Sequence, residues 1–183
     1  PALRANEYRD AWCGQVLPDR VDSDVRVAGW VHRRRDHGGL IFIDLRDRTG
    51  LVQLVFHPDQ AGDAFELAHG LRAEDVLSVS GKVEKRSPET VNPKLPTGEV
   101  EVTVAEARLL SDADTPPFGI ESFSGEVSEE TRLTYRYLDL RRSGPARALK
   151  LRSRANQIAR EVLHDQGFHE IETPTLTRST PEG

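Results

Sequence analysis

The sequence has almost no cysteine and no long apolar run. Cys13 is its only cysteine, which excludes an internal disulfide and argues against a small secreted scaffold. No segment approaches the roughly 20 apolar residues that cross a bilayer, and the N-terminal PALRANEYRD has no signal-peptide core. We therefore expect a cytoplasmic protein without a membrane segment, and we assign no metal ligands.

Basic residues are outnumbered overall but concentrated in two places. The formal net charge is −5, yet residues 131–160 hold eight arginines and Lys150 against Asp139 alone. The preceding residues 111–130 hold six acidic side chains and neither lysine nor arginine. A second basic cluster, RRR, occupies residues 33–35. Both basic runs fit either a solvated surface or a local docking site for a polyanion.

The first part of the chain has the pattern of a small β-barrel. With 183 residues, 37% of them hydrophobic, the chain can form one domain and a large piece of another. Alternating or β-rich segments separated by turn residues occur at 25–33, 40–46, 51–56, 76–84 and 99–109. Between the third and fourth, AGDAFELAHGLRAED suits one short helix. Five strands with a helix after the third predict a mainly β OB-fold, an oligonucleotide-binding barrel, although an unrelated small barrel could share this order.

The composition changes after residue 110, and we divide the chain there. Residues 1–110 form the predicted OB-fold, and residues 111–130 form an acidic linker rich in Ser, Gly and Pro. Residues 131–183 begin a second domain. Its apolar stripe, 151–163, predicts a helix of about 20 residues whose first position is Pro145. FHEIETP then predicts a short strand closed by Pro174.

Strand alternation selects one face of the predicted barrel as a binding surface. The apolar residues of the strands must fill the barrel, so the residues between them face outward. This places Phe42, Gln53 and Glu101 outside, close to the arginines. A ring can stack on a base for about 1 to 3 kcal/mol, while amides and carboxylates bond base edges and Arg holds phosphates. The pattern predicts a surface for single-stranded nucleic acid, unless the N-terminal 20 residues cover Phe42.

Three segments together resemble a known family. GWVHRRRDHGGLIFIDLRDRTGLVQLVF, TYRYLDLRR and GFHEIETPTLTRSTPEG are similar to the N-terminal part of a bacterial aspartyl-tRNA synthetase. RYLDLR also occurs in the related lysyl enzymes, whereas TPEG favours the aspartyl family. The resemblance implies an OB-fold that binds the tRNA anticodon. It also implies the start of an α+β class II catalytic domain, which attaches L-aspartate to tRNA(Asp) with ATP and Mg²⁺.

The resemblance also assigns roles to single residues. It implies anticodon contacts by Phe42 as the stacking ring, by Gln53 and Glu101 at base edges, and by Arg33, Arg35 and Asp36 in the anticodon loop. Glu182 matches a glutamate that contacts the amino group of substrate aspartate. The long helix, the strand and Pro174 resemble motif 1, a homodimer-interface element, although simple core packing would also explain the helix.

His37 and Glu89 are candidate determinants of tRNA choice. His37 follows RRRD at the mouth of the predicted anticodon surface. Aspartyl synthetases that also charge tRNA(Asn) often resemble this sequence in having His there, where strictly specific ones tend to have Leu. A second such position falls near Glu89. The resemblance therefore implies charging of both tRNAs, unless His37 merely caps the Gly38-Gly39 turn.

The sequence stops before the segments that would complete catalysis. It ends at Gly183, ahead of the motifs 2 and 3 whose arginines bind ATP and the reacting phosphate. We expect no catalytic residue here, and no aspartyl-adenylate formation by these 183 residues alone. Two alternatives remain open. One is a non-catalytic OB-fold protein that binds single-stranded nucleic acid, which leaves GFHEIETP and TPEG without a role, and the other is a related class II enzyme for lysine or asparagine.

Overall fold

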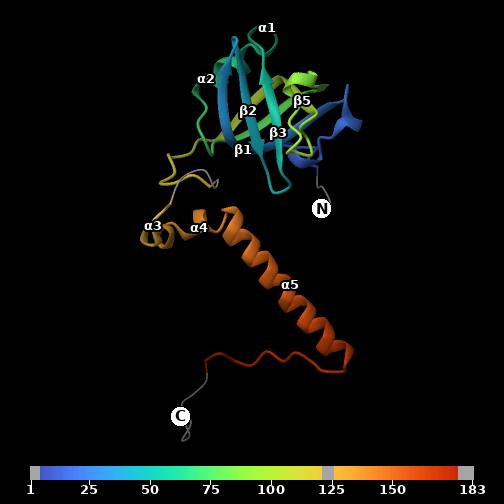
Figure 1. Cartoon of the computed structure of the whole chain (residues 1–183), viewed down its shortest axis with the longest axis vertical. Helices are drawn as coiled ribbons and strands as arrows, with labels where there is room; N and C mark the ends of the chain where they lie inside the picture. Colours follow the sequence, from blue (N-terminus) through green and yellow to red (C-terminus); the bar gives the residue numbers. More distant parts are fainter. Residues whose placement is uncertain (1–4, 121–125, 177–183) are drawn as a thin grey trace, which may run out of the picture. The chain divides into compact units, whose positions relative to one another are not determined.

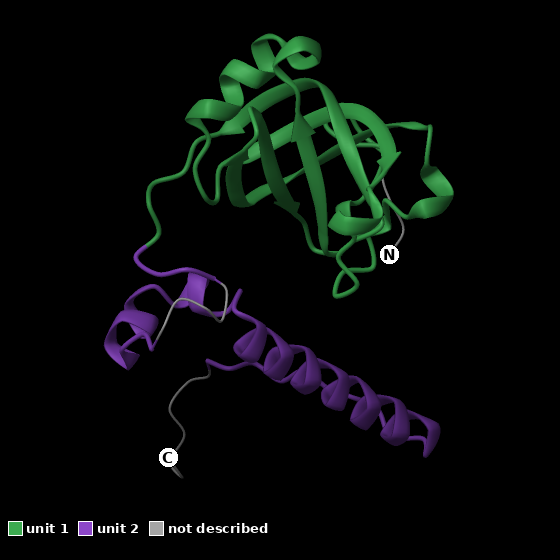
Figure 2. Cartoon of the chain, turned by 45° about the horizontal axis from the view of Figure 1, so that its top comes forward, with its two compact units in different colours: residues 1–116 green, residues 117–183 purple. Residues whose placement is uncertain are grey.

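The computed structural model describes residues 5–120 and 126–176, and the chain divides into two compact units, residues 1–116 and 117–183 (Figure 2). The helices and strands are β1 Asp24–His37, β2 Leu40–Arg46, β3 Leu51–Phe56, α1 Pro58–Ala61, α2 Asp63–Gly70, β4 Val76–Lys85, β5 Val100–Ser111, α3 Glu129–Thr134, α4 Arg136–Asp139 and α5 Ser143–Asp165, and Figure 1 labels each of them except β4. Short 3₁₀ turns occur at Cys13–Gln15, Pro18–Arg20 and Pro88–Thr90. Among the described residues, none of the helices combines the length and apolar character that a bilayer crossing requires.

The five strands of the first unit close into a barrel in the order β1-β2-β3-β5-β4. Neighbours are antiparallel except β3 and β5, which are parallel. The predicted five-stranded OB-fold is therefore confirmed, and β2 and β3 have the predicted bounds. β1 extends beyond the predicted end at residue 33 because its second half pairs with β2 as far as His37. Gly38 and Gly39, with φ of 60° and 80°, form the two-residue turn of this hairpin.

Two helices rather than the single predicted one connect β3 to β4. α1 and α2 meet at Gly62, whose φ of 43° and ψ of −113° are not helical. The glycine thus interrupts a stretch whose apolar residues had suggested one continuous helix. Ala61, Ala64 and Ala68 of the pair are buried against the barrel.

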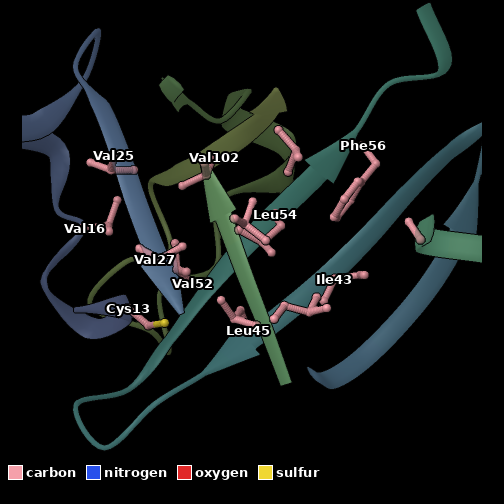
Figure 3. Packing of buried hydrophobic residues seen from close by; sticks show 14 of the residues in the cluster. Cys13, Val16, Val25, Val27, Ile43, Leu45, Val52, Leu54, Phe56 and Val102 are labelled. Atoms are coloured by element: carbon pink, nitrogen blue, oxygen red, sulfur yellow. The ribbon is translucent and has the colours of Figure 1, made fainter. Parts of the chain in front are cut away.

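The inner face of the barrel is the apolar set that alternation predicts. Ile41, Ile43 and Leu45 of β2 are between 0% and 1% exposed, and Val52, Leu54 and Phe56 of β3 are fully buried. The inward residues of β5 are Val100, Val102 and Val104. Figure 3 shows these side chains converging on one another from several strands. The core thereby fixes which residues of the same strands face outward.

The N-terminal segment packs against the barrel near the turn between β2 and β3. The backbone N–H of Cys13 donates to Asp47 Oδ2 (2.8 Å), and that of Gly14 donates to Thr49 Oγ1 (2.9 Å). Burial, followed by the negative charge of Asp47, raises the pKa of the Cys13 thiol well above its ordinary value. The thiol therefore stays neutral and inaccessible, as expected of a structural cysteine.

The described part of the second unit is helical. α5 begins at Ser143, two residues before the predicted Pro145, and Gly167 follows it with a φ of 85°. The short strand predicted at FHEIETP is absent from the described residues, and Pro174 lies in an exposed irregular segment. A strand needs a paired neighbour to satisfy its backbone, and the described part of this unit offers none. The apolar stripe of α5 is also exposed rather than packed in a core, with Leu151 at 71% and Ile158 at 44%.

Candidate nucleic-acid interface

The outward side chains of β1, β2 and β3 form three rows across the sheet. The strand register places Arg33, Asp44 and Gln53 in one row, Arg35, Phe42 and Val55 in the next, and His37 and Leu40 in the third. We call this surface the outer face. Residues that pair across neighbouring strands point to the same side, so each row is a set of neighbours. Phe42 thus lies beside Arg35, with a row of polar residues along one side of it.

A β-bulge brings the arginines onto this face. The register between β1 and β2 shifts between Val31 and Arg33, which leaves His32 as the extra residue. Val31 is fully buried, so unbroken alternation would turn Arg33 and Arg35 toward the interior. After the bulge they align with outward residues, while Arg34 pairs with the buried Ile43 instead. The three consecutive arginines are therefore not one cluster, and Arg34 forms an ion pair with Asp36 (2.8 Å).

A chain of polar contacts holds the next part of the outer face. Arg35 Nη2 donates to Asp44 Oδ1 (2.7 Å) and to Gln53 Oε1 (3.2 Å). Gln53 Nε2 donates in turn to Glu101 Oε2 (2.7 Å). Gln53 faces outward as the alternation predicts, but its neighbours leave it only 8% exposed. Its two contacts use half of its hydrogen-bonding capacity and leave one acceptor lone pair and one N–H.

These side chains line a hollow of about 580 Å³, which we call the Phe42 hollow. It brings together six of the eight residues proposed for tRNA contact, namely Arg35, Asp36, His37, Phe42, Gln53 and Glu101. Its other lining residues are Leu40, Val55, His57, Arg86, Ser87 and Thr90. None of them belongs to residues 5–20, so the described part of the N-terminal segment does not line the space around Phe42.

Sequence reasoning missed Arg86 and His57 in this hollow. Arg86 follows β4, and its Nε lies 3.8 Å from Glu101 Oε2, with the side chain 10% exposed. The Nε atoms of Arg86 and Arg35 are buried without a hydrogen-bond partner. Because both arginines line the hollow, their guanidinium groups give it a cationic character that suits an anionic or carbonyl-rich ligand. Only the order of the elements, which brings the loop after β4 beside β3, could have indicated Arg86.

The other proposed residues lie apart from the hollow or cannot be placed. Arg33 is exposed on the outer face beyond its lining, and Glu89 is exposed in the 3₁₀ turn between the lining residues Ser87 and Thr90. Pro174 belongs to the second unit. Glu182 lies outside the described residues, so the structure gives no geometry for it.

Family comparisons agree with both units. Residues 25–110 match the model of the OB-fold nucleic acid binding domain, and residues 128–183 match that of class II tRNA synthetases (D, K and N). The second match includes GFHEIETP and TPEG. A non-catalytic OB-fold protein would leave these two segments unexplained. It leaves open which of the three amino acids is used.

Curated relatives at high identity narrow the family. The chain is 52% identical to the aspartate–tRNA ligase of Staphylococcus carnosus over 96% of its own length. It is 53% identical to an aspartate–tRNA(Asp/Asn) ligase of Thermoanaerobacter sp. over the same share. The chain spans only about 30% of the length of these relatives.

Solved structures of tRNA synthetases show the same fold. The asparaginyl-tRNA synthetase of Pyrococcus horikoshii superimposes with a TM-score of 0.77 at 30% identity, covering 91% of this chain and 38% of that one. A putative aspartyl-tRNA synthetase from Leishmania major gives a TM-score of 0.81 over 98% of this chain and 38% of that one, but its 24% identity shows the fold alone. From the two family matches and the curated relatives together, we conclude that the chain belongs to the bacterial-type aspartyl-tRNA synthetase family of class II.

Proposed function

We propose that this chain is part of an ATP-dependent ligase that attaches L-aspartate to tRNA(Asp), and that its OB-fold unit binds the anticodon. The observation that carries the proposal is the Phe42 hollow, where an aromatic ring, a fixed amide and two arginines meet on one face of an OB-fold. Family membership supplies the substrate class, since both kinds of curated relative are named as aspartate ligases.

The hollow suits a single-stranded RNA loop for three physical reasons. Phe42 is half-buried and lines the hollow, so a base can stack on the exposed part of its ring. Gln53 and Glu101 are held in place by their mutual hydrogen bond, so their free lone pairs and N–H are already oriented for a base edge. Arg35 and Arg86 line the hollow, so their guanidinium groups can donate to phosphate or base oxygens.

The other parts of the proposed enzyme follow from the second unit and the family. We assign ATP and Mg²⁺ to class II segments that follow Gly183, and contact with the aspartate amino group to Glu182. The exposed apolar residues of α5, including Ile158, Val162 and Leu163, support a homodimer interface that also includes Pro174. We place the activity in the cytoplasm. Charging of tRNA(Asn) as well, through His37 and Glu89, is part of the same proposal.

Binding of an anticodon stem-loop to the Phe42→Ala variant tests the proposed face. We expect the 183-residue chain to bind a tRNA(Asp) stem-loop in a salt-dependent way, and Phe42→Ala to weaken binding by about 1 to 3 kcal/mol through the lost stacking. Fluorescence anisotropy at several salt concentrations measures both effects. Phe168→Ala is the matched control, because Phe168 is exposed in the second unit. Equal affinities of the wild type and Phe42→Ala would refute the assigned face.

A further inference from the structure

One end of the Phe42 hollow contains two histidines and a leucine. His37 ends β1 and pairs with Leu40, the first residue of β2. His57 follows directly after β3, whose last residue Phe56 pairs with Ile41. Continuing this antiparallel register by one position sets His57 across from Leu40. All three residues line the hollow, so His57 completes the third row of the outer face.

The local structure does not use the imidazole of His57. His57 is the N-cap residue of α1, but its side chain makes no capping hydrogen bond, and its backbone carbonyl accepts from Gln60 and Ala61. The side chain is half-exposed and makes no polar contact with any residue in the described part of the chain. A neutral imidazole offers one donor and one acceptor. At His57 both are available to a ligand in the hollow.

The third row lies one strand step beyond Phe42. Residues two apart on a strand face the same side and are about 6.7 Å apart, so Leu40 lies about that distance from Phe42 along β2. This end of the hollow is therefore within reach of a nucleotide that follows or precedes the stacked one in an extended loop. Leu40 is half-exposed there and presents an apolar surface to a base, with an imidazole on either side.

We propose that His37, Leu40 and His57 form a subsite for the anticodon-loop nucleotide next to the one stacked on Phe42. Leu40 contacts the face of the base, and the two imidazoles hydrogen-bond its edge from opposite sides. His57 is thus a further specificity-determining residue, and it acts together with His37. This inference rests on the proposed function for the identity of the ligand. Two imidazoles alone do not suit a metal ion, and the described residues contain no group of three metal-binding side chains.

A panel of anticodon stem-loops tests the subsite. The loops carry each of the four bases at each anticodon position and are bound to the 183-residue chain by fluorescence anisotropy. We expect His57→Ala to weaken binding about 2- to 10-fold through one lost hydrogen bond, and to change base preference only at one position next to the stacked base. His57→Asn retains a donor and an acceptor, so it should restore part of the preference. Because His57 makes no side-chain cap, neither change removes a helix-capping bond.

A double-mutant cycle shows whether the two histidines act on one nucleotide. Combining His57→Ala with His37→Ala should give less than the product of the single effects, because both rings contact the same base. His69→Ala is the matched control, since His69 is exposed on α2 outside the hollow. If the wild type binds and Phe42→Ala weakens it while both His57 variants match the wild type, the subsite is wrong and the proposed function stands. If the wild type binds no stem-loop, both fail.

Discussion

Gln53 connects the charged groups of the outer face. Its amide oxygen accepts from Arg35, and its amide nitrogen donates to Glu101, so one uncharged side chain separates a cation from an anion. A carboxylate could accept from Arg35 but could not donate to Glu101, and an apolar side chain could do neither. Glutamine therefore fits this buried position better than a carboxylate or an apolar side chain would.

Substitutions at Gln53 should affect stability and RNA binding together. Gln53→Leu removes two hydrogen bonds from a buried position, so we expect a loss of about 1 to 3 kcal/mol in unfolding free energy. Gln53→Glu should weaken stem-loop binding more, because it sets two carboxylates side by side near the RNA. Urea unfolding and anisotropy measure the two effects. The control is Gln60→Leu at an exposed position of α1, and unchanged binding by Gln53→Glu would contradict the assignment.

Single-residue prediction from the sequence worked where the backbone is regular. Alternation along β2 correctly placed Phe42 outside and Ile43 inside, since both lie in an uninterrupted strand. It could not place Arg33 and Arg35, because their side depends on the bulge at His32. A bulge changes the face of every later residue, and no residue pattern in RRRDH marks it.

At the scale of elements, the turn between β2 and β3 anchors the N-terminal segment. Asp47 Oδ1 accepts from the N–H and hydroxyl of Thr49 and from the N–H of Gly50, while Oδ2 accepts from the N–H of Cys13. Asp47 is only 8% exposed, so water could not readily take its place as the acceptor for these donors. One carboxylate thus links a turn to a segment that lies 34 residues earlier.

Removing this carboxylate should release the segment that covers Cys13. We expect Asp47→Ala to lower the unfolding free energy by about 1 to 3 kcal/mol and to speed the reaction of Cys13 with a thiol reagent. Chemical denaturation and the rate of thiol labelling in native buffer provide the two readouts. Asp24→Ala, an exposed carboxylate at the start of β1, is the control. Labelling of Asp47→Ala at the wild-type rate would show that the contact does not hold the segment.

Elements were predicted well in the first unit and less well in the second. Each barrel strand has a neighbour within residues 24–111, so local pattern and final pairing agree. The strand predicted at FHEIETP has no partner among the described residues, and the apolar stripe of α5 is exposed. Both features depend on contacts with other segments, which the local sequence pattern cannot show.

At the scale of the whole molecule, the first unit forms its own core, and the second exposes apolar residues. The core cluster of the first unit includes residues from all five strands and from α1 and α2. In the second unit Asp139 is fully buried beside Arg132, Arg136 and Arg142, so one carboxylate organises three guanidinium groups ahead of α5. The chain spans about 30% of the length of its curated relatives. We propose that segments corresponding to the rest of those relatives supply both the cover for α5 and the ATP site.

The choice between tRNA(Asp) and tRNA(Asn) is a property of the whole proposed enzyme. A relative named aspartate–tRNA ligase and one named aspartate–tRNA(Asp/Asn) ligase are 52% and 53% identical to this chain, so overall identity does not separate the two kinds of relative. The two anticodons differ only at their third base. His37 is exposed at the rim of the Phe42 hollow, and an imidazole can donate or accept, so it tolerates different base edges.

We expect the complete enzyme to charge both tRNAs and the His37→Leu variant to disfavour tRNA(Asn). A leucine would leave one base edge without a partner, at a cost of about 1 to 3 kcal/mol, which corresponds to about a 5- to 150-fold change in the ratio of the two kcat/KM values. Steady-state aminoacylation with each tRNA measures this ratio, and His69→Leu on the exposed side of α2 is the control. Aspartyl-adenylate formation without tRNA should be unchanged, because His37 contacts only the anticodon loop in this proposal. The proposed role of His37 is wrong if the wild type already rejects tRNA(Asn), or if the ratio is the same in His37→Leu.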